Sequence, residues 1–70
     1  MFDTKIFGER LKETRLEKDM SALQLGKALG FSDATIFRWE NGSRVPCVES
    51  LYRIAKYFNV PAGWLIGLED

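Results

Sequence analysis

The sequence predicts an all-α protein, a compact bundle of five short helices in which the second and third form a helix-turn-helix. Apolar residues recur at helical spacing along the chain, and no alternating run of strand type is long enough to matter. Capping and stop residues divide this pattern into short pieces. Two pieces of about eight residues are joined only by Gly30, Phe31 and Ser32, so their axes must cross at a large angle.

Composition narrows the class of protein. The chain has 70 residues, which predicts one small domain over residues 1–70. Hydrophobic residues make up 46% and charged residues 29%, a balance that supports one core. With one cysteine and no histidine, the chain cannot form an internal disulfide and lacks the commonest general base and metal ligand. We therefore expect no enzyme activity, no catalytic residue, no cofactor, no metal site and no small-molecule ligand.

Nothing in the sequence predicts a membrane protein. No apolar stretch reaches the roughly 20 residues that a membrane-spanning helix needs. The N-terminus has no basic start followed by an apolar run, so we expect no signal peptide. A lone thiol is typical of the cytoplasm, which is the expected location.

The first two helices follow from periodicity and capping. The first is predicted from about Thr4 to Lys18, with its charged residues in water. Its apolar face consists of Ile6, Phe7, Leu11 and Thr14. The second covers about Ala22–Leu29, because Ser21 and Gln24 match a capping box and Gly30 suits a left-handed helix end.

The third helix is predicted over about Asp33–Glu40. Ser32 is a good cap, and the acid Asp33 in the first turn is favoured by the helix dipole. Asn41 and Gly42 end the helix, because both residue types tolerate a positive φ.

Proline, asparagine and glycine residues mark where the last two helices begin and end. The fourth follows Val45-Pro46-Cys47 and ends at Asn59. Its apolar residues at helical spacing are Val48, Leu51, Ile54, Ala55 and Phe58. The fifth covers about Pro61–Ile66, since proline suits a first helical turn and Gly67 stops the helix.

Residues from about 6 to 67 resemble the helix-turn-helix domain of the Cro/phage-repressor-like (XRE-type) transcription regulators. The most specific part is the run Arg38-Trp39-Glu40-Asn41-Gly42, whose Trp lies 18 residues after the Ser21 cap, together with the ending Trp64-Leu65-Ile66-Gly67. Weaker matches extend along the chain at Arg15, Leu25, Leu29-Gly30, Ser32, Thr35-Ile36, Pro46, Leu51, Ile54-Ala55 and Val60-Pro61.

The resemblance implies a lambda-repressor-like domain of a bacterial or phage regulator that binds double-stranded operator DNA as a two-fold dimer. A repressor, associated with the nucleoid when bound, is the expected type. Carried over residue by residue, the groove-facing positions are Asp33, Ala34, Phe37 and Arg38. Thr35, Asn41, Ser43 and Arg44 match phosphate-contacting positions, and Ser32 opens the helix that carries the site.

Elementary chemistry is compatible with these groove-facing roles. The planar fork of Arg38 suits the two acceptors of a guanine edge, although a surface Arg also binds phosphate or water. Asp33 can accept from a cytosine amino group or serve only as a helix-start charge. Ala34 offers a methyl for thymine or is plain surface. Phe37, between core-facing Ile36 and Trp39, should point outward to thymine methyls, or lie half-buried against the second helix.

The loop after the third helix has phosphate-binding chemistry. Hydroxyls, backbone amides and arginines such as those of Ser43 and Arg44 hold phosphates without reading sequence. Ordinary loop charge is the alternative for Arg44, and helix termination is the alternative for Asn41.

Several other residues are assigned structural roles. Arg15 and Glu40 resemble a family pair that ties the first helix to the end of the third, and a buried Glu40 needs such a partner. Aromatic and aliphatic residues at Trp39, Ile54, Phe58 and Trp64 are expected in the core. Cys47 replaces the usual Ser or Thr cap of the fourth helix, and a redox role is the alternative.

Two features depart from the family and keep a second function open. The family often has Gln where this chain has Ala22, and the net charge is zero, with ten basic and ten acidic residues. A homodimer would double the DNA contacts, and its candidate surface is Tyr57, Trp64, Leu65 and Leu68. The alternative is a protein-interaction module, antitoxin-like or adaptor, that keeps the fold and presents Phe37 to a protein.

Overall fold

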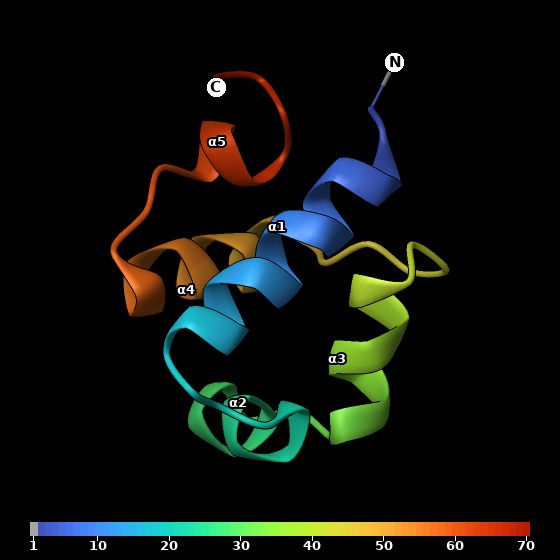
Figure 1. Cartoon of the computed structure of the whole chain (residues 1–70). Helices are drawn as coiled ribbons and strands as arrows, with labels where there is room; N and C mark the ends of the chain where they lie inside the picture. Colours follow the sequence, from blue (N-terminus) through green and yellow to red (C-terminus); the bar gives the residue numbers. More distant parts are fainter. Residues whose placement is uncertain (1) are drawn as a thin grey trace.

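Five α-helices and no strand make up residues 2–70, the part of the chain that the computed structural model describes (Figure 1). Met1, the first residue of the predicted domain, lies outside the described residues. The helices are α1 (Thr4–Glu17), α2 (Ala22–Leu29), α3 (Asp33–Glu40), α4 (Val48–Phe58) and α5 (Ala62–Leu65). The predicted all-α, five-helix class is confirmed.

Most helix ends lie where the capping signals place them. Ser21 and Gln24 exchange the two bonds of a capping box, at 2.8 and 3.0 Å. The backbone turns left-handed at Gly30 and Asn59, the C-caps of α2 and α4. The predicted fifth helix is one residue too long at each end, because Pro61 and Ile66 are its caps. The first ends at Glu17, one residue early.

Every helix contributes to one core. α1 crosses the middle of the molecule and the other four helices lie around it (Figure 1). The largest completely buried side chains come from all five helices and are Phe7, Leu11, Leu25, Ile36, Ile54 and Leu65. Partly buried residues including Met20, Phe31 and Leu51 pack against them. The chain therefore has apolar contacts that fix all five helices around α1.

Two apolar residues lie elsewhere than the sequence pattern or assignment suggests. Val48 shares the helical spacing of the apolar residues of α4 but is 84% exposed. Leu65 was placed on the dimer surface but has no exposed surface, because α5 packs it into the core beside α1. Of the other candidates for that surface, Trp64 is half-buried, whereas Tyr57 and Leu68 are exposed.

Candidate nucleic-acid interface

The turn between α2 and α3 brings the two backbones into close contact. The Phe31 amide donates to the Gly26 carbonyl at 2.7 Å. A Cβ at Gly26 would lie 2.4 Å from the carbonyl oxygen of Phe31, so only glycine permits this approach. Sequence reasoning did not single out Gly26. The available signal was an isolated glycine inside a predicted helix, which often indicates close packing.

A second glycine lets α1 approach the end of α3. A Cβ at Gly8 would lie 2.3 Å from the Glu40 carbonyl oxygen, which any side chain would collide with. From α3 itself, Ile36 and Trp39 are buried, and the Trp39 ring meets the Phe31 ring edge-on at 5.0 Å between centroids. These contacts hold one face of α3 and leave the opposite face free.

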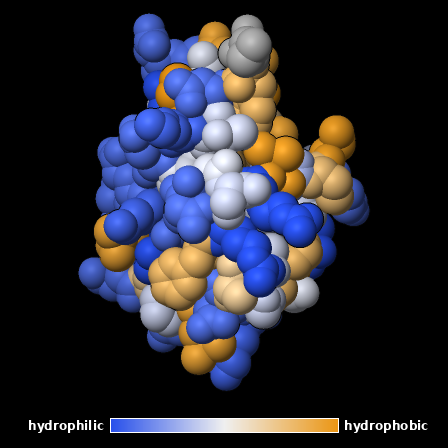
Figure 2. Space-filling view, turned by 90° about the vertical axis from the view of Figure 1, so that its right-hand side faces the viewer, coloured by the Kyte–Doolittle hydropathy of each residue, from blue (hydrophilic) through white to orange (hydrophobic). Residues whose placement is uncertain are grey.

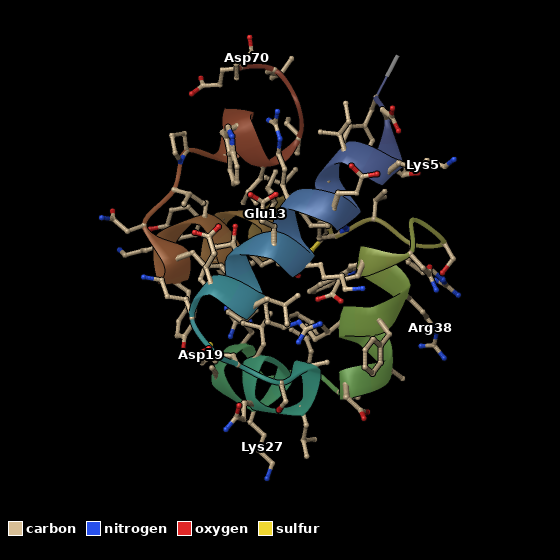
Figure 3. All side chains as sticks on the ribbon, viewed as in Figure 1. Lys5, Glu13, Asp19, Lys27, Arg38 and Asp70 are labelled. Carbon is tan, nitrogen blue, oxygen red and sulfur yellow. The ribbon has the colours of Figure 1, made fainter. Side chains whose placement is uncertain are left out.

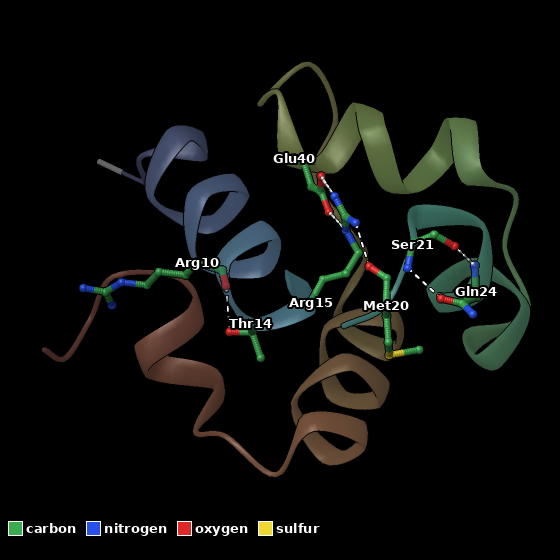
Figure 4. Close-up of polar contacts among 7 residues, drawn as sticks. All are labelled: Arg10, Thr14, Arg15, Met20, Ser21, Gln24 and Glu40. Atoms are coloured by element: carbon green, nitrogen blue, oxygen red, sulfur yellow. Dashed lines mark hydrogen bonds and ion pairs between the residues drawn. The ribbon is translucent and has the colours of Figure 1, made fainter. Parts of the chain in front are cut away.

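A buried ion pair fixes the C-terminal end of α3 to α1, as predicted for Arg15 and Glu40. Arg15 Nε and Nη2 donate to the two carboxylate oxygens of Glu40 at 2.7 and 2.9 Å, and Nη1 donates to the Met20 carbonyl at 2.9 Å (Figure 4). The side chains are only 7% and 5% exposed. Hydrogen bonding to Glu40 raises the already high pKa of Arg15, so the guanidinium stays charged.

The free face of α3 presents the residues that were predicted to face the groove. Asp33, Ala34, Phe37 and Arg38 are all exposed. Phe37 is 52% exposed, so its ring reaches solvent as expected while about half of its surface is covered by the protein. Arg38 projects from the molecule into solvent (Figure 3). What each of these side chains contacts stays a prediction.

The hydroxyls at the start of α3 are already engaged with the protein. Ser32 Oγ accepts from the Thr35 amide at 3.2 Å and lies 3.1 Å from the Thr35 hydroxyl. Ser32 is therefore the N-cap of α3, as its residue type predicts.

The loop after α3 is folded back on the helix end. Asn41 Oδ1 accepts from the Ser43 amide at 2.9 Å, which gives Asn41 the structural use that was its alternative role. The amides of Ser43 and Arg44 point at the Arg38 carbonyl at 3.1 and 3.2 Å, and Gly42 has a φ of 80°. These bonds hold Arg44 beside the end of α3.

Two arginines border a polar hollow at this corner. The hollow, of about 220 Å³, is lined by Thr35, Arg38, Trp39, Arg44 and Val45. Within residues 2–70 the ion pair of Arg15 with Glu40 is the one present, so Arg38 and Arg44 have no carboxylate partner. In Figure 2, which faces the side where α3 lies, hydrophilic surface occupies the middle of the molecule. A phosphate group has the size and charge to sit here.

Local structure accounts for Ala22 and describes Cys47, two residues that replace the family's usual ones. Ala22 is 4% exposed and belongs to the core cluster, and Gln24 is held by the capping box. Cys47 is the exposed N-cap of α4, and its Sγ lies 3.4 Å from Ser50 Oγ. Hydrogen bonding from Ser50 lowers the pKa of the Cys47 thiol.

No helix of residues 2–70 is long and apolar enough to cross a membrane. The same residues contain no group of Cys, Asp and Glu side chains placed to hold a metal ion.

The fold and the turn define a helix-turn-helix protein, and comparison with known families agrees. The helix-turn-helix family model matches residues 11–65. The chain therefore belongs to this helix-turn-helix family, and the resemblance to the Cro/phage-repressor-like (XRE-type) regulators is confirmed.

Individual relatives differ in length and in their named roles. The chain is 36% identical over 64 residues to the HTH-type transcriptional activator BcrR of Enterococcus faecalis, covering 91% of this chain and 31% of BcrR. It spans between 31% and 67% of the curated relatives that it matches.

Among solved structures, the P22 c2 repressor in complex with a synthetic operator matches with a TM-score of 0.84 and 27% identity, over 90% of this chain and 96% of the repressor chain. FeII HppE in complex with substrate matches with a TM-score of 0.82 and 31% identity, over 91% of this chain but 37% of HppE. The fold thus also occurs as a minor part of a longer chain with another role.

Proposed function

We propose that this chain is a sequence-specific double-stranded DNA-binding domain of a transcriptional regulator, with α3 lying in the major groove. The observation that carries the proposal is the exposed face of α3, on a helix-turn-helix, ending at two arginines without a carboxylate partner. In this motif the second helix enters the major groove while the first crosses the backbone. The operator named with the P22 c2 repressor structure supports DNA as the ligand.

The residues divide by chemistry into readers and phosphate contacts. Arg38 reads a guanine with its two parallel donors, and Phe37 and Ala34 pack on thymine methyls. Asp33 accepts from a cytosine amino group, which also excludes other bases at that position. Phosphate contacts hold the DNA backbone in register, and they come from Ser32, Thr35, Asn41, Ser43 and Arg44. Of these residues, Thr35 and Arg44 line the hollow beside α3.

A dimer acts on two half-sites, because one neutral domain has few phosphate contacts. Residues 1–70 serve as one domain of this dimer, in the cytoplasm and on the nucleoid when bound. Repression is the proposed effect, since occupancy of a promoter is enough to block transcription, whereas activation needs a further contact. The similarity to the P22 c2 repressor supports repression, whereas the relative BcrR is named as an activator.

The salt dependence of DNA affinity tests the proposal without knowledge of the operator. Affinity for a mixed-sequence duplex should fall steeply between about 50 and 200 mM salt, because phosphate contacts release counterions. Arg44→Ala should lower the slope of log affinity against log salt by about one per protomer. Lys12→Ala, the same change of charge on the exposed surface of α1, should leave the slope unchanged.

The second candidate is a protein-interaction module, favoured by the 52% exposure of Phe37 in the middle of α3. Such a module would bind its partner through this ring. A folded chain with no measurable DNA affinity at 50 mM salt would select this candidate and overturn the first.

A further inference from the structure

The outward side of α4 carries exposed apolar side chains that are not packed in the core. Val48 and Tyr52, one helical turn apart, are 84% and 56% exposed. Buried residues of α4, such as Ile54 and Phe58, lie on the opposite face. Two other exposed side chains of α4 bond to other parts of the chain: Arg53 donates to the Leu29 carbonyl and Tyr57 to the sulfur of Met20. The remaining two, Glu49 and Lys56, are charged. Val48 and Tyr52 therefore form a short apolar stripe on the surface of α4.

This stripe borders a groove between α4 and α5. The groove, of about 340 Å³, is lined by Val48, Leu51, Tyr52, Ala55, Lys56, Asn59, Val60 and Ala62. Leu51 also lines an adjoining apolar hollow with Phe2, Val45, Pro46 and Ile66. A continuous apolar surface of this kind on a small chain is typical of an association site.

The charges beside the stripe favour a second copy of this chain as the partner that covers the groove. Glu49 lies in the first turn of α4 and Lys56 in its last turn, and both are exposed. They are seven residues apart, almost two full helical turns, so they lie on the same side of the helix as each other. Lys56 Nζ is 3.3 Å from the Tyr52 hydroxyl, which places it at the edge of the apolar stripe.

We infer that two copies of this chain associate through α4, with the helices antiparallel about a two-fold axis near Tyr52. In this arrangement each Glu49 lies opposite the partner's Lys56, and the two Val48–Tyr52 stripes cover each other. In a parallel arrangement Glu49 and the partner's Lys56 would instead lie at different heights along the helices and could not pair. The inference deepens the proposed function, whose dimer it specifies, and rests on it for its biological role.

The same geometry leaves the DNA-reading surface open. The exposed residues of α3 and the groove of α4 have no residue in common. Association through the groove of α4 therefore uses neither Arg38 nor Arg44. The predicted surface around Tyr57 is replaced, because Tyr57 faces Met20 rather than the apolar groove.

Charge reversal at Glu49 and Lys56 tests the inference by sedimentation equilibrium without DNA. Glu49→Lys or Lys56→Glu alone should raise the dimer dissociation constant by about tenfold, because each change creates two like-charge contacts. The double reversal should return it to within about threefold of the original, since two opposite-charge contacts form again. Both single changes also oppose the helix dipole of α4, so recovery in the double variant cannot come from better folding.

Apolar and unrelated positions provide the matched controls. Tyr52→Glu should abolish the dimer, whereas Leu23→Glu, on an α2 side chain 51% exposed, should not change it. Circular dichroism confirms folding of each variant. A chain that is monomeric up to millimolar concentration, or a double reversal that is weaker than either single, would overturn the inference. A monomer that still binds DNA with steep salt dependence overturns this dimer alone, whereas a dimer without DNA affinity overturns the proposed function alone.

Discussion

Removing one charge of the buried ion pair should loosen the end of α3. In Glu40→Gln the amide can accept one hydrogen bond from Arg15, but its NH₂ group then faces a guanidinium N–H, donor to donor. The side chains are 7% and 5% exposed, so water replaces little of the lost partner. Arg15 keeps its bond to the Met20 carbonyl and its charge stays buried.

The expected loss of unfolding free energy is about 3 kcal/mol, the lower end of the range for breaking a buried pair, because a little solvent still reaches both groups. A chain of 70 residues has a total stability of about 3.5–10 kcal/mol on general grounds. The variant should therefore melt about 12–24 °C lower and be marginal at 25 °C.

Replacing both partners gives the contrasting result. Arg15→Met with Glu40→Leu removes both charges and keeps apolar volume, so the double variant should lie within about 1 kcal/mol of the original protein. The remaining loss of unfolding free energy comes from the Met20 carbonyl, which loses its hydrogen-bond donor. Urea denaturation followed by tryptophan fluorescence measures the stability of the single and the double variant. As a control, Glu13→Gln on the exposed surface of α1 should change stability by less than about 0.5 kcal/mol. The reasoning fails if Glu40→Gln costs less than 1 kcal/mol or if the double variant is the less stable of the two.

Three further predictions concern the turn, the thiol and the aromatic ring of the site. Gly26→Ala should cost about 1–3 kcal/mol in urea denaturation, because its Cβ would lie 2.4 Å from a carbonyl oxygen, whereas Lys27→Ala next to it should be neutral. Ser50→Ala should raise the pKa of Cys47 toward its ordinary value and slow alkylation at neutral pH; an unchanged pH-rate profile would contradict the assigned hydrogen bond. Because folding lowers this pKa, the thiolate favours the folded state above the ordinary thiol pKa, and that contribution is lost as the pH falls. Phe37→Ala should leave stability within about 0.5 kcal/mol but lower DNA affinity about tenfold, and equal affinity would remove the ring from the interface.

The helices and caps could be predicted because their signals are local. Ser21 with Gln24, Ser32, Gly30 and Asn59 each fix a helix end through their own side chain or backbone conformation. The outward direction of Phe37 followed in the same way from its place between two core residues.

Features that depend on how helices meet could not be predicted from local patterns. Val48 continues the apolar spacing of α4 but is 84% exposed, which periodicity along one helix does not reveal. Leu65 was counted as surplus, yet α5 supplies it to the core. The close approaches at Gly8 and Gly26 depend on the backbone of another segment, which spacing along one helix does not reveal.

Selection of binding sites from a random duplex pool tests the central claim that α3 reads DNA. The account predicts a two-fold symmetric site with half-sites about one helical turn apart. Arg38→Ala should relax the preference at one base pair per half-site, at a cost of about 1–3 kcal/mol. Arg44→Ala should keep the same consensus with weaker binding throughout. No consensus from the folded chain near physiological salt would contradict the claim.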